Sequence, residues 1–257
     1  MKVQLLSYTQ HPEELVAIAA SNCVSGSSIA EITKQCLDKS KVRSIINTIK
    51  KNHHYSVFEH VSFTFGIEGV SRVLLAQITR HRIASFSVRS MRYAAIDESL
   101  GSMLGSTIEE QRLMNYNNGT LFKEESLRIF HKAYEEAIKH YQELKSLGVS
   151  QENARYVLPN GTKTAIVLTM NARELMHFFG LRCCKHAQSE IRVLAKEMSE
   201  LVTKVAPILF SDLNGASCEQ LGYCPEGKRS CHRYPTLDEL IGAYKDRRNN
   251  NATRDDG

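Results

Sequence analysis

Residues 61–68 alternate apolar and polar side chains, and this alternation constrains the segment to an extended strand. Polar residues or glycine separate the apolar positions Val61, Phe63, Phe65 and Ile67. Because successive side chains of a strand point to opposite faces, such a segment buries one face and exposes the other. The apolar, β-branched segment over residues 164–170 predicts another strand. The sequence therefore predicts a small sheet.

Most other apolar residues recur every three or four positions, which is the spacing of one helix face. This spacing predicts helices over residues 12–22, 29–37, 42–49, 70–78, 123–147, 171–183 and 186–205. Ser28 and Glu31 have the spacing of a capping box. Long helices and few strands predict an α+β fold, with several helices packed on a small mixed or antiparallel sheet. We expect a single domain over residues 1–246 and a polar, disordered tail over residues 247–257.

The composition is that of an ordinary globular protein. The 257 residues carry a formal charge of +5, which permits anionic small molecules or nucleic acid as ligands. No apolar run approaches the roughly 20 residues that a membrane helix needs. The first residues lack the apolar core of a signal peptide, so we expect a cytoplasmic protein.

Seven cysteines occur in the chain, and we expect no structural disulfide in the cytoplasm. Cys183 and Cys184 are adjacent, whereas five and six residues separate Cys218, Cys224 and Cys231. Zinc sites usually contain closer pairs, so buried thiols are the simpler interpretation and a metal site is the alternative. We assign no metal ligands.

Residues 80–93 concentrate positive charge. The stretch holds four arginines, one histidine and three serines but no carboxylate. Such a cluster is tolerated when it is solvated or when an anion binds among the cations, and arginine forks suit phosphate oxygens. The stretch therefore predicts a site for a ligand with several phosphate oxygens. A solvated basic loop and a nucleic-acid surface are the alternatives.

The same stretch resembles the defining motif of the flavin-dependent thymidylate synthases. In that motif Arg-His-Arg is followed after seven residues by Ser, as in residues 80–90 of this chain. The further blocks that follow the order of that family are residues 54–60, Gln77, residues 154–159, residues 171–182 and residues 186–188. The resemblance extends from about residue 50 to about residue 205.

The resemblance implies a methyltransferase that reductively methylates dUMP to dTMP for de novo dTMP biosynthesis. It implies FAD as cofactor, methylenetetrahydrofolate as carbon donor and NADPH as reductant. It also implies a homotetramer with shared sites, whose partners are dUMP, folate and NADPH rather than nucleic acid or a membrane. No G-x-G-x-x-G sequence occurs, so FAD is not expected on a Rossmann turn.

The resemblance also assigns roles to individual residues. Those implied for dUMP are Gln77, Arg80, Ser90, Arg92, Arg155 and Arg182. Those implied for FAD are Ser56, Glu59, Arg80, His81, Arg82, Asn171, Arg173, His177 and His186. The catalytic candidates are Arg182, which would stabilise negative charge on the uracil ring, and His54, near the flavin and the folate. Two structural alternatives stay open, in which Ser90 is a turn or cap residue and Arg182 pairs with a nearby carboxylate such as Glu190 and merely holds the fold.

Local spacing predicts which of these side chains are neighbours. If the helix over residues 70–78 continues, Gln77, Arg80 and His81 project from one face near its end. Pairs four positions apart are also expected to be helix neighbours, namely Arg173 with His177 and Arg182 with His186.

The chain departs from the common form of the motif at four positions. Ser87 and Val88 replace Asn and Glu, Arg89 adds a charge, and His177 replaces Asn. These changes affect local contacts to nucleotide and flavin, but the phosphate-binding arginines and Arg182 are retained. We therefore expect an active enzyme. The competing hypotheses are a nucleic-acid-binding protein and a homologue that binds flavin without turnover.

Overall fold

The computed structural model describes residues 1–93 and 124–252, and for residues 124–127 and 247–252 it describes only the helical backbone. The strands are β1 (Lys2–Tyr8), β2 (Ser62–Ser71), β3 (Ala84–Val88) and β4 (Lys163–Asn171). The α-helices are α1 (Pro12–Asn22), α2 (Ile29–Gln35), α3 (Lys39–Lys51), α4 (Arg72–Ile78), α6 (Glu124–Ser146), α7 (Gln151–Ala154), α8 (Ala172–Arg182), α9 (Ser189–Val205), α10 (Pro207–Phe210), α11 (Ser217–Leu221) and α12 (Leu237–Ala252). Short 3-10 helices are η1 (Tyr55–His60), η4 (Arg155–Val157) and η5 (Gly227–Arg229).

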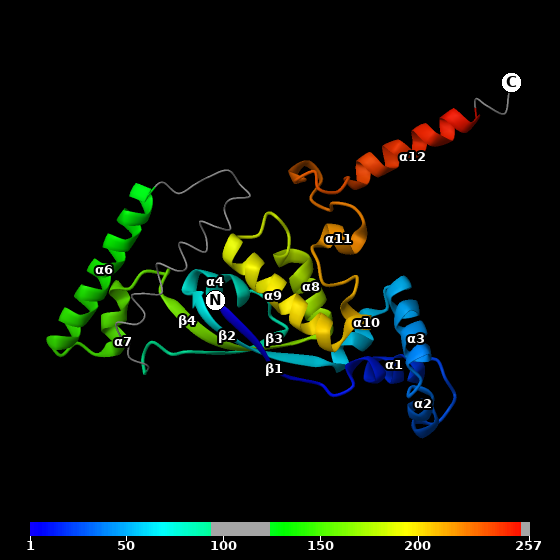
Figure 1. Cartoon of the computed structure of the whole chain (residues 1–257), viewed down its shortest axis with the longest axis horizontal. Coiled ribbons are helices and arrows are strands. Elements are labelled where there is room, and N and C mark those ends of the chain that lie inside the picture. The colour runs from blue at the N-terminus through cyan, green and yellow to red at the C-terminus, as the bar shows by residue number, and fades with distance from the viewer. Residues whose placement is uncertain (94–123, 253–257) are drawn as a thin grey trace.

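The four strands form one antiparallel sheet in the order β1-β2-β4-β3 (Figure 1). The alternation predicted for residues 61–68 is confirmed, because Phe63, Phe65 and Ile67 are buried and the residues between them are not. Leu168 of β4 pairs with Phe65 of β2, so the buried faces of the two central strands coincide. The strand expected over residues 164–170 is therefore confirmed as β4.

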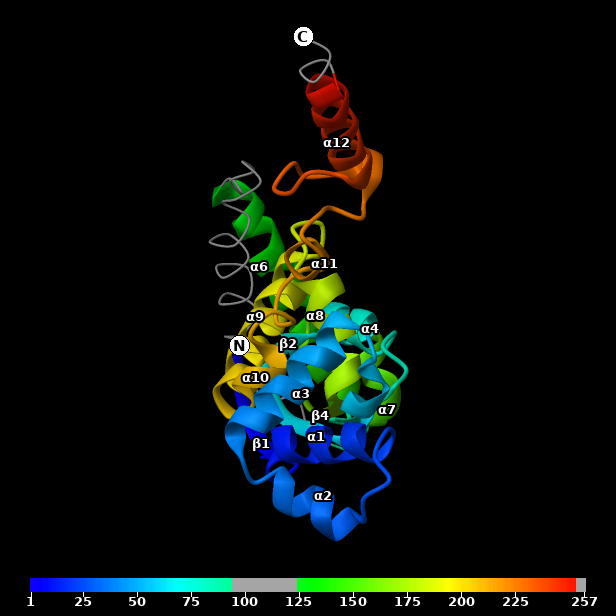
Figure 2. The same cartoon turned by 90° about the vertical axis from the view of Figure 1, so that its right-hand side faces the viewer.

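Helices α8 and α9 contact this sheet, and the hydrophobic core lies between them and the strands. Helices α1, α2 and α3 lie at one end of the sheet and α6 and α7 at the other, whereas α12 projects away from it in both views (Figures 1 and 2). This arrangement confirms the predicted α+β fold in a single domain. No helix in the described part of the chain is long and apolar enough to cross a membrane.

Most predicted helices are confirmed, and local capping explains several of their ends. The capping box forms, since the Ser28 amide donates to the Glu31 carboxylate at 2.9 Å and the Glu31 amide donates to Ser28 Oγ. Pro12 occupies the first turn of α1, where its missing N–H costs nothing.

Two expected helix continuations are wrong. Val70 belongs to β2, and α4 ends at Ile78, so Arg80 and His81 follow the helix instead of sharing a face with Gln77. Helix α8 ends at Arg182, and His186 lies in the turn before α9. At the C-terminus, α12 continues to Ala252 and thus extends past the boundary expected at residue 246; residues 253–257 lie outside the described residues.

A buried carboxylate joins the starts of α4 and α9. Glu190 is 2% exposed, and it accepts hydrogen bonds from the amide of Ser71 at 2.7 Å and from the Ser71 hydroxyl. The same hydroxyl oxygen accepts from the amide of Leu74 and so caps α4. Because the N-termini of both helices carry partial positive charge, a carboxylate between them is stabilised.

We expect Glu190→Gln to lower the free energy of unfolding by about 1.5–3 kcal/mol, because hydrogen bonds to a buried charged acceptor are weakened. Urea unfolding at neutral pH measures the change. Glu200→Gln is the matched control, because Glu200 is exposed on the same helix. Equal stability of the two variants would contradict the role given to Glu190.

Candidate functional site

The basic stretch over residues 80–93 does not form one cluster within the chain. Its central part is β3, an edge strand that pairs with β4 from Ala84 opposite Met170 to Val88 opposite Ile166. A strand rises about 3.3 Å per residue, so β3 separates the two ends of the stretch. Arg80, His81 and Arg82 precede β3, whereas Ser90 and Arg92 follow it. The expected site residues therefore fall into separate groups.

The first group surrounds Arg182 at the C-terminal end of α8. The Arg182 Nε donates to His81 Nε2 at 3.1 Å, and its Nη2 lies 3.4 Å from the carbonyl oxygen of Gln77. His81 Nδ1 lies 2.8 Å from a carboxylate oxygen of Glu174. Since an arginine nitrogen can only donate, Nε2 of His81 must accept, and its proton lies on Nδ1, pointing to Glu174. The structure thus assigns a neutral imidazole to His81.

The surroundings of His81 favour this neutral state. The side chain is 4% exposed, and burial is the largest cause that lowers the pKa of His81 from its ordinary value of 6.5. The positive charge of Arg182 lowers it as well, while the hydrogen bond to Glu174 acts in the opposite direction. Burial also lowers the pKa of the half-buried Arg182 guanidinium. Arg182 is therefore a cation held in a partly dry position beside a neutral ring.

Local sequence places Glu174 in the first turn of α8. Asn171 is the N-cap of this helix, and its side-chain oxygen accepts from the Glu174 amide at 2.8 Å. The Glu174 side chain is thereby directed to His81 near the positive end of the helix dipole. Sequence reasoning missed Glu174, although the spacing Asn171-x-x-Glu174 is a capping signal that could have found it.

Glu190 is not the partner of Arg182. Its carboxylate accepts hydrogen bonds from Ser71, so the pairing of Arg182 with Glu190 is wrong. Gln77 stays close to Arg182 and also donates its side-chain amide to Gln188, the residue before α9.

A second group lies where η1 meets α8. Arg173 forms an ion pair with Glu59, and both side chains are about half exposed. His54 and Ser56, at the start of η1, are exposed as well. The structure thus brings the expected flavin residues of the segment 54–60 to the N-terminal part of α8.

A third group lies beyond β3. Arg92 forms an ion pair with Glu152, with Nε 2.9 Å from one carboxylate oxygen, and its Nη2 donates a hydrogen bond to the other at 3.1 Å. Arg155 Nε donates to the backbone oxygen of Glu152 at 2.9 Å. The Ser90 hydroxyl accepts from the amide of Arg92 at 3.2 Å, which is the turn role considered for it. Glu152 thus contacts both arginines of this group. No sequence pattern predicted that it would lie at the site.

Other expected residues lie on the surface. Arg80, Arg82 and His186 are exposed and make no side-chain hydrogen bond or ion pair within the described residues. His177 is exposed, and its ring meets that of His81 at a centroid distance of 5.8 Å. These side chains are available to an anionic ligand.

Ligand atoms of His81, Glu174 and His177 lie within 4.8 Å of one another, a spacing that a metal site could use. The chemistry of the donors argues against this use. Both ring nitrogens of His81 are already engaged, by Glu174 and by Arg182. A cation at this position would also lie beside the charge of Arg182.

Two cavities in the described part of the chain lie elsewhere. A groove of about 970 Å³ runs between β1, the N-terminal ends of α1 and α3, and the α9–α10 connection. A smaller one of about 320 Å³ lies on the open face of the sheet and includes Ser87 and Arg89. No residue expected for dUMP or FAD lines either cavity. These two cavities are therefore separate from the expected site.

We expect the His81 imidazole to remain neutral at pH 6.5, with its proton on Nδ1, because burial and Arg182 disfavour the imidazolium. Two-dimensional NMR of the histidine ring nitrogens measures both the tautomer and the pKa. Glu174→Gln should lower the pKa of His81 further, because it removes the charge that favours protonation. Titration of His81 at or above 6.5 would contradict this assignment.

Comparison with known proteins gives the context of these groups. The family described as "Thymidylate synthase complementing protein" matches residues 4–208. The flavin-dependent thymidylate synthase of Geobacter sulfurreducens is 44% identical over 242 residues, which cover 94% of this chain and 98% of that protein. The enzyme of that name from Pyrococcus furiosus is 39% identical over 88% of this chain and 90% of its own length.

Two solved structures share the fold. One is the flavin-dependent thymidylate synthase ThyX from Helicobacter pylori complexed with FAD and dUMP, with a TM-score of 0.63, 25% identity and coverage of 83% of this chain and 99% of that chain. The other is the UMP/dUMP methylase PolB from Streptomyces cacaoi bound with 5-Br dUMP, with a TM-score of 0.63, 26% identity and coverage of 82% and 93%. The sequence motifs, the fold and these similarities agree, and the chain belongs to the flavin-dependent thymidylate synthase family.

Proposed function

We propose that this methyltransferase uses bound FAD to convert dUMP to dTMP, with methylenetetrahydrofolate as carbon donor and NADPH as reductant, in cytoplasmic de novo dTMP synthesis. The observation that carries the proposal is the Arg182 guanidinium, half-buried and fixed by the buried His81. Its position in the family motif corresponds to the residue implied for the uracil ring. The FAD-bound and dUMP-bound relative described above supports the choice of both ligands.

The residues of the chain fit polyanionic ligands. The pyrophosphate of FAD and the phosphate of dUMP need fixed cations and hydrogen-bond donors. Arg80 and Arg82 are exposed and have no carboxylate partner within the described residues, so they can bind phosphate without breaking an ion pair. Arg173 and Arg92 are held in defined orientations by Glu59 and Glu152. We assign Arg80, Arg82 and Arg173 to FAD. The histidines assigned to FAD are His81, His177 and His186.

Arg182 is assigned to stabilise the negative charge that develops on the uracil ring of dUMP during methylation. Methylation at C5 requires electron density to build on the uracil ring, and a fixed cation in a partly dry site stabilises that charge. The neutral His81 accepts from Nε, which leaves Nη1 of Arg182 available to the ring. His54, exposed at the start of η1, is assigned to the folate side. FAD, when bound, supplies the redox chemistry that the side chains lack.

The separation of the groups by β3 supports a homotetramer with shared sites. In one chain Arg80 precedes β3 and Arg182 lies beside His81 at the same end of this strand, whereas Ser90 and Arg92 follow the strand, although all four are assigned to dUMP. None of the four lines either of the two cavities described above. A site that uses both sets is complete when a second subunit places its Ser90 end against the Arg182 end of the first.

Nucleic-acid binding is the less well supported function. Such binding needs solvated basic residues along one surface. Here Arg92 and Arg173 are paired with carboxylates, and Arg182 is half-buried against His81. These three charges are therefore paired or partly buried, and they lie in separate groups instead of along one solvated surface.

We expect the purified chain to be yellow, to release FAD on denaturation, and to form dTMP from dUMP, methylenetetrahydrofolate and NADPH. Omission of dUMP is the control for uncoupled NADPH oxidation. On dilution, dissociation of the tetramer, measured by light scattering, should coincide with loss of flavin, measured by flavin fluorescence. FMN in place of FAD, or no flavin after reconstitution, would overturn the proposal. Bound FAD without dTMP formation would identify the chain as an inactive homologue.

We expect Arg182→Ala to lower kcat by about 100-fold or more, the scale for removing one charge-stabilising donor. Flavin content and melting temperature should stay near those of the wild type, because Glu190 is not its partner and the side chain is only half-buried. Arg43→Ala, an exposed arginine on α3, is the matched control and should leave kcat unchanged.

The opposite pattern would remove Arg182 from the catalytic residues. A structural arginine would give a variant with a lower melting temperature and lost flavin, while kcat per bound flavin would stay the same. Steady-state kinetics normalised to flavin absorbance separates the two patterns.

A further inference from the structure

Five of the seven cysteines lie in one region, where the C-terminal segment packs on the end of α8. They are Cys183, Cys184, Cys218, Cys224 and Cys231, and all are free thiols. Helix α11 is held against α8 because Gln220 donates to the carbonyl oxygen of Met176 at 3.1 Å. The approach is close, since a Cβ added at Gly180 would lie 2.9 Å from Ser217 Oγ. Cys218, the next residue, is thereby brought to the end of the helix that Cys184 follows.

Three of these thiols belong to one hydrophobic core, and a fourth lies in the loop between Cys224 and Pro235. Cys218 and Cys224 are 8% and 6% exposed, Cys184 packs against the same core, and Cys231 is half-buried. Burial raises the pKa of Cys218, and the negative charges of Cys184, Cys224 and Cys231 raise it as well.

Cys183 is separate from these four. Its Sγ points to the carbonyl oxygen of Asn214 at 4.0 Å, and burial raises its pKa to about 11. It therefore remains a protonated core thiol.

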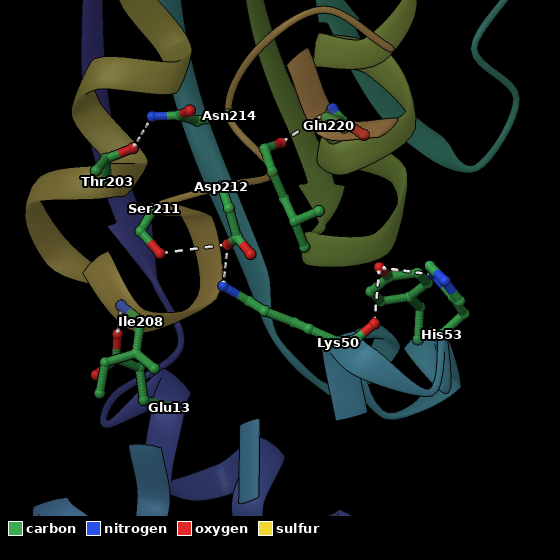
Figure 3. Close-up of polar contacts among 11 residues, drawn as sticks. Glu13, Lys50, His53, Thr203, Ile208, Ser211, Asp212, Asn214 and Gln220 are labelled. Atoms are coloured by element: carbon green, nitrogen blue, oxygen red, sulfur yellow. Dashed lines mark hydrogen bonds and ion pairs between the residues drawn. The ribbon is translucent and has the colours of Figure 1, made fainter. Parts of the chain in front are cut away.

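The segment that carries these cysteines has little else to hold it. Up to Leu221 the chain is anchored, by the ion pair of Lys50 with Asp212 and by the hydrogen bond from Asn214 to Thr203 at 3.2 Å (Figure 3). Of the described residues beyond Leu221, the core includes only Cys224 and, at its edge, Tyr234.

Residues 222–236 nevertheless adopt a defined loop. The Cys224 amide donates to the carbonyl oxygen of Pro235 at 2.7 Å, and Cys224 forms an isolated bridge with Thr236. Gly222, Gly227 and His232 have positive φ angles, so the chain turns sharply on both sides of the cysteines. Irregular segments with so little core are commonly stabilised by a disulfide or a structural metal.

We propose that Cys184, Cys218, Cys224 and Cys231 bind one Zn²⁺ as a tetrahedral thiolate site that fixes the C-terminal segment to the end of α8. Four thiolates around zinc, with Zn–S distances of about 2.3 Å, are a common structural site. Three of the ligands lie beyond residue 208, where the family match ends. The site is distinct from the dUMP and FAD groups and does not depend on the proposed reaction.

Zinc must draw the sulfurs together. Among the described residues, the set of ligand atoms within 4.8 Å of one another is that of His81, Glu174 and His177, so the four sulfurs are farther apart than in a metal complex. The turns at Gly222 and Gly227 permit this closure, and metal binding commonly completes the folding of such loops. Arg233, which pairs with Glu219, lies close enough to Cys218 to lower its pKa and would compensate the negative charge of the complex.

The test uses the full chain, purified without an affinity tag and under reducing conditions, and measures metal by elemental analysis. We expect one zinc per chain. After exchange for Co²⁺, we expect the d–d absorption of a tetrahedral thiolate complex, at wavelengths longer than those of flavin absorption. Cys218→Ser and Cys231→Ser should lose the metal. Cys36→Ser, which removes a buried thiol in the N-terminal region, is the matched control and should retain it.

The remaining outcomes overturn the proposal. These are a chain that holds no zinc and takes up no Co²⁺, zinc retained by folded Cys231→Ser, iron and sulfide in place of zinc, or an intact mass that shows disulfides. If Cys218→Ser fails to fold, Cys231→Ser still decides, because Cys231 lies outside the hydrophobic core. Flavin content and dTMP formation are measured separately, so a failure of the proposed function does not affect this result.

Discussion

The buried hydrogen bond between Glu174 and His81 determines the chemistry available at the end of α8. It joins residues 93 positions apart in the sequence, and it fixes the imidazole so that Nε2 faces Arg182. If Nε2 carried a proton, it would repel the arginine donor, and the guanidinium would lose its orientation. The same contact ties the chain that leads into β3 to the helix that follows β4. The orientation of Arg182 thus depends on the protonation state of His81.

Features that arise from neighbouring residues were predictable from the sequence. The alternation in residues 61–68, the capping box at Ser28 and the long helices depend on local spacing, and the structure confirms them. Helix α4 was placed too broadly, because its start is set by Ser71, which is engaged by the distant Glu190. The partners Glu174 and Glu152 were missed for the same reason. A carboxylate in the sequence does not reveal which distant cation it will meet.

The arginine-rich stretch shows how sequence density and spatial density differ. Four arginines within residues 80–93 suggested one anion site. However, β3 is an extended strand, and it separates Arg80 and Arg82 from Arg92 in space. In space, Arg92 lies with Glu152 and Arg155, whereas Arg182 lies with His81. Family motifs assign roles to residues along the chain, but they contain no information on which residues of one subunit lie together. That division follows from strand geometry alone.

The end of α8 is where the two inferred sites come closest. Arg182 is the last residue of the helix, and Cys184 follows two positions later. The side chain of Arg182 is oriented by His81, but its backbone depends on how α8 ends, and α11 packs directly against that end. A metal bound by Cys184 would restrain this backbone without touching nucleotide or flavin. A C-terminal segment outside the matched family region can therefore contribute to the position of the Arg182 guanidinium through the helix end that both share.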